Sequence, residues 1–395
     1  MTAFFWTTVA GGLLFAVSLA QLGLLAEGQR KLRGRKIVSG GSTIFLGQDR
    51  DIWSPLIYTE VNLTRISNIK SSFHLRTYDP EGVIFYGDTK DGEDWFVLSL
   101  KDGVPLMQIT RENVSVSVAG GPKLNDGGWH TLEVSNEGNF VILEVDRSPA
   151  LVVGTPYTEE EEDLSSPLRL ALGGILIGTE KLIVKFNPKM DGCVRGGLWL
   201  NLSMPWEGDM DDLWPCYRNV RPGSYFPGNG FAIFNTSVFP FKKEHGFRIE
   251  LLGDFSQVDG TILSIKAPQE EPMFTAVAKN VTKEVEIKFG EERIVIKSSF
   301  KRLLITFLED LLKVLPDEDE SKTSTFPVSP TSHPSYKTIW DKGRLAFGGL
   351  LGEDEGNVGS RYLTGCLDKI QVQGKDVDLD LAIKHESISS HSCPV

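Results

Sequence analysis

Hydrophobic and polar residues alternate over short stretches from about residue 52 onward. Phe73-His-Leu-Arg-Thr-Tyr alternates with a period of two, and further strand-forming runs are Val83–Tyr86, Trp95–Leu100 and Phe140–Val145. A period of two turns one face of a strand toward a core and the other toward solvent. These runs therefore predict β-strands.

The predicted strands are separated by residues that favour tight turns. These residues occur in Asp79-Pro-Glu-Gly, Lys101-Asp-Gly and Asn125-Asp-Gly-Gly, and they readily adopt turn conformations. Many short strands at this spacing, without long amphipathic helices, predict an all-β antiparallel sandwich. One stretch, Leu303–Leu315, fits either a helix or strands.

An internal repeat sets the domain organisation. Arg169-Leu-Ala-Leu-Gly-Gly is followed by Gly192-Cys193, and Arg344-Leu-Ala-Phe-Gly-Gly is followed by Gly365-Cys366. Two copies of one pattern predict two homologous domains in tandem. The length of 395 residues also exceeds that of one ordinary core.

The boundary between the domains is expected in 217–229, where proline and glycine cluster. The first domain is placed at 51–219 and the second at 220–395. Before them, residues 27–50 are basic and glycine-rich and are expected to form a flexible N-terminal arm.

The first 26 residues are apolar and carry no charge, with small residues before Gln21. They resemble the core and cleavage site of a signal peptide, although the usual basic start is missing. An uncleaved membrane anchor is the alternative, because basic residues follow the apolar stretch. Cysteines and glycosylation motifs favour secretion. No later stretch is apolar for the roughly 18 residues that a membrane span needs.

The four cysteines fall into two pairs of similar spacing, one near the end of each half of the chain: Cys193 with Cys216, and Cys366 with Cys393. Four cysteines allow three pairings, and the internal repeat favours one disulfide in each domain. A zinc site is the alternative, but the spacings are too long for the usual ligand pairs.

Five N-glycosylation motifs fit the same compartment. They begin at Asn62, Asn113, Asn201, Asn235 and Asn280.

The net charge of −12 argues against a nucleic-acid-binding protein, which needs a basic surface for phosphates. The sequence also contains no hydrolase elbow, zinc-protease helix, phosphate-binding loop or dinucleotide fingerprint. His74 and His130 lie in or beside strands, where a hydrogen-bonded structural role is more common than catalysis. A binding protein rather than an enzyme is therefore expected.

A series of motifs resembles the laminin-G-like domain family in the order of its conserved strands. The motifs are Ser71–Asp88, Asp94-Trp-Phe-Val-Leu, Leu124-Asn-Asp-Gly-Gly-Trp-His, Leu170-Ala-Leu-Gly-Gly and Met190-Asp-Gly-Cys. The same pattern recurs more faintly between Phe247 and Cys393, so the resemblance covers roughly residues 60–395. It implies two tandem laminin-G-like antiparallel β-sandwiches of jelly-roll type.

The stretch from Asp79 to Asp88, with Asp94-Trp95-Phe96, is most similar to the steroid-binding members of this family. That similarity implies a secreted carrier of androgens and oestrogens, with the ligand between the sheets of the first domain. It implies that Ser71 hydrogen-bonds the ring-A oxygen, that Asp94 accepts from the 17β-hydroxyl, and that Phe96 packs on the steroid.

The chain departs from the steroid-binding pattern at several positions. Arg111 replaces an asparagine beside Asp94 and could pair with Asp94 or donate to a keto oxygen, which affects ligand preference. Asn136 and Leu168 replace two methionines, and only Leu168 keeps the surface apolar. Glu112 and Ser165 replace the histidines of a family zinc site, so no equivalent zinc site is expected.

Asp79 resembles the carboxylate of a family calcium site, which implies a structural calcium ion; an ordinary turn is the alternative. The family also implies a homodimer formed through the first domain. The main alternative function is an extracellular-matrix or receptor-ligand protein that recognises protein or glycan through its loops. A sandwich hydrolase would need a nucleophile and base that the sequence does not show.

Overall fold

The computed structural model describes the following residues: 43–47, 53–62, 64, 70–137, 140–154, 167–198, 216–239, 246–267, 274–308, 311–317, 321, 323–327, 342–351, 362–385 and 387–395. The expected signal peptide, most of the expected arm, Asn201 and Ser165 lie outside these ranges.

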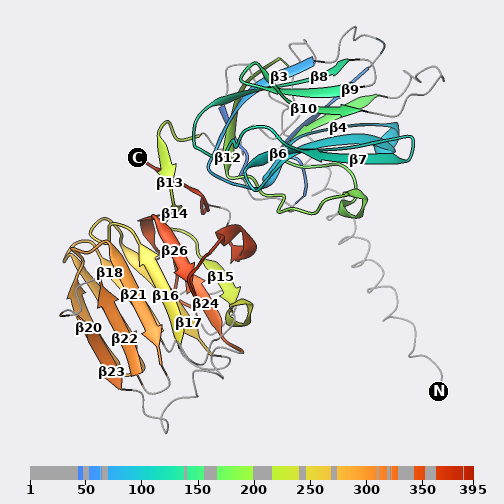
Figure 1. Cartoon of the computed structure of the whole chain (residues 1–395). Coiled ribbons are helices and arrows are strands. Elements are labelled where there is room, and N and C mark those ends of the chain that lie inside the picture. The colour runs from blue at the N-terminus through green and yellow to red at the C-terminus, as the bar shows by residue number, and fades with distance from the viewer. Residues whose placement is uncertain are drawn as a thin grey trace, which may run out of the picture.

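Two six-stranded sheets form the first sandwich (Figure 1). The first sheet has the order β1 (Thr43–Phe45), β12 (Gly192–Leu198), β3 (Lys70–Thr77), β8 (His130–Glu137), β9 (Phe140–Val145) and β10 (Ser148–Gly154). The facing sheet has the order β2 (Ile57–Val61), β11 (Leu168–Leu172), β4 (Gly82–Thr89), β5 (Asp94–Lys101), β6 (Val104–Arg111) and β7 (Val114–Ala119).

A seven-stranded and a six-stranded sheet form the second sandwich. The larger sheet has the order β20 (Glu292–Lys297), β19 (Glu284–Phe289), β18 (Phe274–Lys279), β17 (Gly260–Lys266), β24 (Arg344–Phe347), β15 (Ala232–Asn235) and β28 (Ile383–Lys384). The other has the order β23 (Ser324–Pro327), β22 (Leu311–Pro316), β21 (Arg302–Phe307), β16 (Phe247–Leu252), β26 (Lys369–Val372) and β27 (Lys375–Asp376).

Two short strand pairs lie where the sandwiches meet. They are β13 (Val220–Pro222) with β29 (Ser392–Pro394), and β14 (Ser224–Pro227) with β25 (Thr364–Leu367). The helical elements named among the described residues are three-residue 3-10 turns: η2 (Lys90–Gly92), η3 (Thr179–Lys181), η4 (Thr236–Val238) and η6 (Leu379–Leu381). None of the helices in the described ranges is long and apolar enough to cross a membrane. The all-β prediction is confirmed.

The internal repeat corresponds to equivalent strands in the two sandwiches. β11 and β24 carry the two copies, and each is followed directly by a glycine with positive φ, Gly173 and Gly348. The amide of Gly173 donates to the carbonyl of Ile84, and the amide of Gly348 donates to the carbonyl of Ile262, both at 3.0 Å. The repeated sequence therefore makes the same strand-end connection twice.

The strand predictions hold, with two points that the sequence left open or missed. Within the stretch Leu303–Leu315, residues 303–307 and 311–315 lie in two paired strands, β21 and β22, rather than in a helix. Thr43–Phe45, which was assigned to the flexible arm, instead forms β1 and pairs with β12. A three-residue strand in a glycine-rich context carries too little periodicity to be recognised from the sequence. Its extended conformation is stabilised by pairing with β12.

Buried side chains fill the space between the sheets of each sandwich. In the first sandwich, the two inner faces share one core. A second apolar cluster covers the outer face of the β4–β5–β6 sheet, where Trp95 and Val97 pack against Ile175, Leu182 and Phe186. Successive residues of β5 therefore belong to different cores, which fixes the direction of each side chain.

Candidate functional site

Ser71 lies on the inner face of β3. Side chains alternate along this strand, and Phe73 and Leu75, which share the face of Ser71, belong to the inter-sheet core. Ser71 is only 2% exposed and pairs across the sheet with Val134 of β8. A hydroxyl at the start of β3 therefore faces the interior of the sandwich.

Asp94 begins the inward-facing row of β5. Phe96, Leu98 and Leu100 of this row pack in the inter-sheet core, whereas Trp95 belongs to the outer cluster. The Asp94 Oδ1 atom accepts a hydrogen bond from the backbone amide of Glu112 at 2.8 Å. The hairpin between β6 and β7 thereby holds the carboxylate at the strand end.

Phe96 continues a row of aromatic rings between the sheets. Its ring centroid lies 5.3 Å from that of Phe85 in an edge-to-face arrangement, and Phe85 lies 5.9 Å from Phe73. The space for the Phe96 ring is provided by Gly87, its cross-strand neighbour on β4. A Cβ atom at position 87 would lie 2.4 Å from a Phe96 ring carbon.

Arg111 and Leu168 also lie on inner faces. Arg111 follows Met107 and Ile109 in the inward row of β6, and its Nε atom lies 4.0 Å from Glu112 Oε1. The pairing of Trp95 with Thr110 places Arg111 opposite the start of β5, beside Asp94. Leu168, at the start of β11, is 7% exposed and packs in the core.

The five residues that the resemblance assigned to the steroid are brought to the same end of the first sandwich. The connection between β3 and β4 lies at the opposite end of the sandwich. The start of β3 and the end of β4 therefore both lie at this end. The register Arg169 with Asp88 places the start of β11 at the same end. Ser71 comes from one sheet, and Asp94, Phe96, Arg111 and Leu168 come from the other.

A polar pocket of about 610 Å³ opens beside this end on the outer side of the sheet. Asp94, Glu112 and Lys181 contribute to its lining. Asn136, the polar residue at a position where the steroid-binding pattern has a methionine, is exposed at the end of β8. The rim around the inward-facing residues is therefore hydrophilic, while the inner faces are apolar.

A second pocket, of about 210 Å³, lies between the two sandwiches and is lined mainly by apolar surface. Tyr78, Tyr217 and Tyr225 contribute to its wall, together with the Cys193–Cys216 disulfide. Its volume is below the roughly 300–1,000 Å³ that is typical of small-molecule sites. The pocket beside Asp94, of about 610 Å³, falls within that range.

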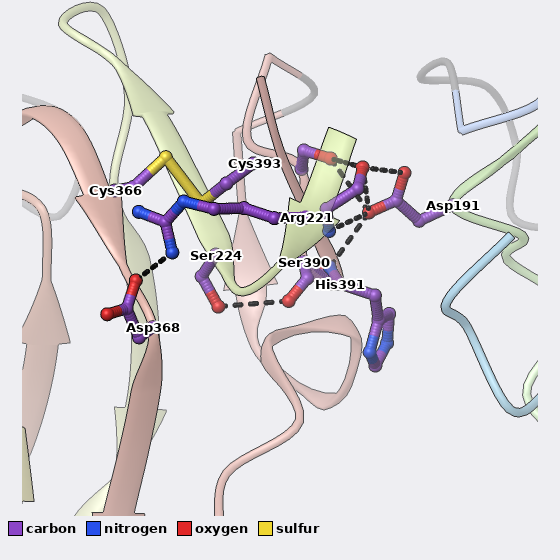
Figure 2. The surroundings of a disulfide bond; sticks show 10 residues. Asp191, Arg221, Ser224, Cys366, Asp368, Ser390, His391 and Cys393 are labelled. Atoms are coloured by element: carbon purple, nitrogen blue, oxygen red, sulfur yellow. Dashed lines mark hydrogen bonds and ion pairs between the residues drawn. A yellow bond between two sulfur atoms is a disulfide. The ribbon is translucent and has the colours of Figure 1, made fainter. Parts of the chain in front are cut away.

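Both predicted disulfides are present, Cys193 with Cys216 and Cys366 with Cys393. Each pairs a strand of its sandwich with a residue near the junction. In the segment before Cys393, the hydroxyl of Ser389 and the amides of His391 and Ser392 donate to Asp191 Oδ2 of the first sandwich at 2.7, 2.8 and 3.1 Å (Figure 2).

Of the four glycosylation motifs within the described ranges, Asn62, Asn113 and Asn235 are exposed and Asn280 is half-buried. The Oδ1 atom of Asn62 accepts hydrogen bonds from the backbone and hydroxyl of Thr64.

Asp79 does not lie near the inward-facing residues but at the junction with the second sandwich. It is 2% exposed, its Oδ1 accepts the amide of Glu81 at 3.0 Å, and its Oδ2 accepts the amide of Asp191 at 2.8 Å. Across the junction, His391 Nε2 lies 3.5 Å from Asp79 Oδ1. The sequence analysis missed His391, because no local pattern links it to a carboxylate at the other end of the chain.

The groups around Asp79 include both oxygen and nitrogen atoms. Calcium takes six to eight oxygen ligands, whereas the neighbours here include an imidazole nitrogen and, on Asp380, the ammonium of Lys384 at 2.5 Å. The side-chain ligand atoms of Asp79, Asp380 and His391 all lie within 4.8 Å of one another. The structure brings two carboxylates and an imidazole together here, and the calcium ion expected at Asp79 stays a prediction.

Comparisons with known proteins identify the family of the chain. A laminin G domain model matches residues 75–204. Sex hormone-binding globulin of Homo sapiens is 31% identical over 349 residues, covering 86% of this chain and 84% of the relative, and that of Oryctolagus cuniculus is 31% identical over 355 residues, covering 88% and 86%. Growth arrest-specific protein 6 of Mus musculus is 25% identical, covering 86% of this chain but 54% of the relative.

The solved structure of mouse laminin alpha1 domains LG4-5 superposes with a TM-score of 0.66 at 16% identity, covering 91% of this chain and 96% of that one. This likeness concerns the fold alone and confirms two tandem laminin-G-like sandwiches. The identity to the globulins extends over both sandwiches and over the strands that carry Ser71, Asp94 and Phe96. The chain therefore belongs to the sex hormone-binding globulin family of tandem laminin-G-like proteins.

Proposed function

We propose that this protein is a secreted carrier that reversibly binds sex steroids between the two sheets of its first sandwich. The observation that carries the proposal is the convergence of five side chains from four strands at one end of the sandwich. β5, β6 and β11 belong to one sheet and β3 belongs to the other. The relatives' name, which refers to sex hormones, gives the ligand class.

The arrangement suits a flat and mostly apolar ligand with a polar group at each end. Phe96 and Leu168 offer apolar surface, while Ser71 and Asp94 offer hydrogen-bonding groups from opposite sheets. Burying on the order of 400 Å² of steroid at about 25 cal/mol/Å² contributes roughly 10 kcal/mol before the cost of association. The polar side chains then determine the orientation of the ligand.

In the proposed orientation, Ser71 hydrogen-bonds the ring-A oxygen and Asp94 accepts from a 17β-hydroxyl. Arg111 stands beside Asp94 and is a donor at the same end. A 17-keto oxygen needs a donor, whereas a 17β-hydroxyl donates to a carboxylate. The pair therefore gives this chain a means of binding both types of steroid.

The test is equilibrium binding of radiolabelled dihydrotestosterone and oestradiol to the purified full chain. Ser71→Ala and Asp94→Asn should each weaken binding about tenfold or more, since the first removes a hydrogen bond worth roughly 1–3 kcal/mol and the second replaces a charge-assisted hydrogen bond with a weaker neutral one. Ser72→Ala and Glu93→Gln are matched controls, because Ser72 lies on the outer face of β3 and Glu93 is exposed.

Absence of saturable binding by the wild-type chain would reject the steroid proposal. The matrix or receptor-ligand function would then be preferred. Equal effects of Ser71→Ala and Ser72→Ala, with binding retained, would move the ligand away from the inner face of β3.

Secretion and dimer formation are parts of the same proposal. Two disulfides and three exposed glycosylation motifs suit an oxidising, extracellular environment. β7 is an edge strand of the first sandwich with Val114 47% exposed, so it is available to pair with a second copy. Expression in mammalian cells tests secretion by the appearance of the protein in the medium. N-glycosidase treatment of the secreted protein tests glycosylation, and sedimentation equilibrium tests dimer formation.

A further inference from the structure

The polar pocket beside Asp94 has an expected glycosylation motif in its wall. Asn113 and Ser115, the first and third residues of the motif Asn113-Val-Ser, both contribute to the lining. Asn113 is exposed, so its side-chain amide is accessible from solvent. A glycan attached to this amide therefore starts at the wall of the pocket.

The hairpin between β6 and β7 holds Asn113 beside the pocket (Figure 1). Glu112 and Asn113 form its two-residue turn, with φ of 51° and 64°, a conformation that asparagine tolerates well. The amide of Glu112 donates to Asp94 Oδ1 at 2.8 Å, and the hydroxyls of Thr110 and Ser115 lie 2.8 Å apart across the two strands. The turn is thereby tied to the strand end that carries Asp94.

The wall of the pocket combines charged groups with one aromatic side chain. Glu93 and Asp94 bring carboxylates, and Lys181 brings an ammonium that donates to the carbonyl of Gly92 at 2.8 Å and retains further N–H groups. Trp95 also contributes to the lining. Sugars present hydroxyl and amide groups beside apolar ring faces and can bond to all of these groups. An apolar ligand would instead remove water from the charged groups without replacing it.

We propose that the pocket beside Asp94 is the docking site for the first sugars of an N-linked glycan on Asn113. The covalent link keeps the sugar at a high effective concentration, so a few weak hydrogen bonds suffice to hold it. The volume of about 610 Å³ is in the range of small-molecule sites. In the attachment step, the Asn113 Nδ2 atom bonds to the anomeric carbon of a lipid-pyrophosphate-linked oligosaccharide. The amide loses a proton, and the lipid pyrophosphate leaves with the electrons of the broken carbon–oxygen bond.

The docked glycan also affects the proposed ligand site, because Asp94 belongs to both. A sugar in the pocket excludes water from the outer side of the Asp94 carboxylate, and a lower local dielectric strengthens the hydrogen bond that this group makes to a ligand. The glycan therefore slows ligand release. Docking rests on the proposed secretion, and the effect on release rests on the proposed steroid binding.

The first test measures how fast an N-glycosidase removes glycans from the full chain expressed in mammalian cells, before and after denaturation. Asn62 is the matched control, since it is exposed, lies in the same sandwich and is not part of the pocket. The enzyme cleaves next to the first sugar and acts only on the undocked glycan. Native removal at Asn113, followed by mass spectrometry of glycopeptides, should therefore be about tenfold or more slower than at Asn62. The two rates should be similar after denaturation.

Equal native rates at the two sites, or no glycan at Asn113, would overturn the proposal. Occupancy is determined in the cells as well as in the medium, so a glycosylated chain that is retained separates failure of secretion from failure of docking.

The second test separates docking from an effect of the turn itself. Lys181→Met removes a donor from the pocket wall and keeps the motif, whereas Lys123→Met changes an exposed lysine outside the pocket. Lys181→Met should raise the native removal rate at Asn113 about threefold to tenfold, as expected for loss of one hydrogen bond. Lys123→Met should leave it unchanged. Equal rates in the two variants would place the glycan outside the pocket and overturn the proposal.

The third test measures dissociation of dihydrotestosterone from wild type, Ser115→Ala, which lacks the motif, and Ser115→Thr, which keeps it. Ser115→Ala should release the steroid about threefold to tenfold faster than the other two. All three should be alike when they are made under inhibition of N-glycosylation. Equal rates in the glycosylated proteins would overturn the effect on release. A wild-type chain that binds no steroid would reject the carrier function, while glycan docking is decided by the removal rates.

Discussion

Gly87 lies opposite Phe96 across β4 and β5, and the absence of a side chain at position 87 leaves the space that the Phe96 ring fills. The ring also contacts Phe85 edge to face. A glycine in a central strand costs conformational entropy and forgoes packing. Here that cost is offset by the packing of the Phe96 ring into the space beside Gly87 on the inner face.

Gly87→Ala should displace the Phe96 ring and weaken steroid binding. The added methyl would lie 2.4 Å from a ring carbon, and overpacking of this kind costs roughly 1–3 kcal/mol, or about a tenfold to hundredfold change in affinity. Gly154→Ala is the control, because its new Cβ would meet Phe140 at an ordinary 3.6 Å. Ligand titration of both variants checks this, and wild-type affinity of Gly87→Ala would contradict it.

Arg111→Asn should shift ligand preference toward 17β-hydroxyl steroids. Arg111 is the inward-facing donor beside Asp94, and a shorter neutral side chain no longer offers a charged donor to a keto oxygen. Competition assays with paired 17-keto and 17β-hydroxyl steroids measure the ratio of dissociation constants. The ratio should change about tenfold or more, in line with loss of a charge-assisted hydrogen bond. An unchanged ratio would show that Arg111 does not contact that end of the ligand.

Arg169→Met should destabilise the first sandwich by about 3–5 kcal/mol, because it leaves the buried Asp88 carboxylate without its positively charged partner. The Asp88 side chain is fully buried, and its two oxygens accept Arg169 Nε at 2.6 Å and Nη2 at 2.5 Å. Arg221→Met breaks an ion pair with Asp368 in which both side chains are more than 40% exposed, and it should cost at most about 1 kcal/mol. Chemical denaturation of both variants gives the comparison, and similar losses would contradict the burial argument.

The pH dependence of stability should contain a contribution from His130. Its Nδ1 lies 2.8 Å from Asp146 and its Nε2 lies 3.1 Å from Asp126. Burial lowers the pKa of His130, but the hydrogen bonds to the two carboxylates outweigh this effect, so the pKa lies above its usual value of 6.5. A raised folded-state pKa stabilises the protein fully below pH 6.5 and progressively less as pH rises through the folded value.

His130→Gln should remove this contribution. The stability difference between wild type and variant should be constant near pH 5.5 and fall as pH rises above 6.5. Its size should be about 1 kcal/mol or less, because the carboxylates of Asp126 and Asp146 are 60% and 51% exposed. Urea unfolding across this range measures it, and a difference that grows with pH would have the wrong sign.

Local patterns in the sequence were sufficient for most of the fold. Alternation in β3 and β5 identifies which side chains face inward. The Asp102-Gly103 turn was predictable because these residue types tolerate positive φ, and both have positive φ in the structure. Leu303–Leu315 stayed ambiguous because its many apolar residues fit either a helical or a strand pattern. In the structure, a hairpin between β21 and β22 and pairing of β21 with β16 determine its conformation.

The candidate site was predictable only in part. The positions of Ser71, Asp94 and Phe96 on inner faces follow from strand alternation, but their assignment to one ligand came from the family resemblance. The surroundings of Asp79 could not be predicted, since His391 and Asp380 are brought to it by the docking of two sandwiches rather than by a local motif.

The pairing of β13 with β29 has a consequence for the order of events during synthesis. The first sandwich has all its strands once residue 198 has left the ribosome, whereas the segment that holds Asp191 emerges only with residues 389–392. Domains generally fold as they emerge, the N-terminal one first. A translating chain therefore presents a finished first sandwich with Asp79 and Asp191 still exposed to water for the whole time that the second is being made.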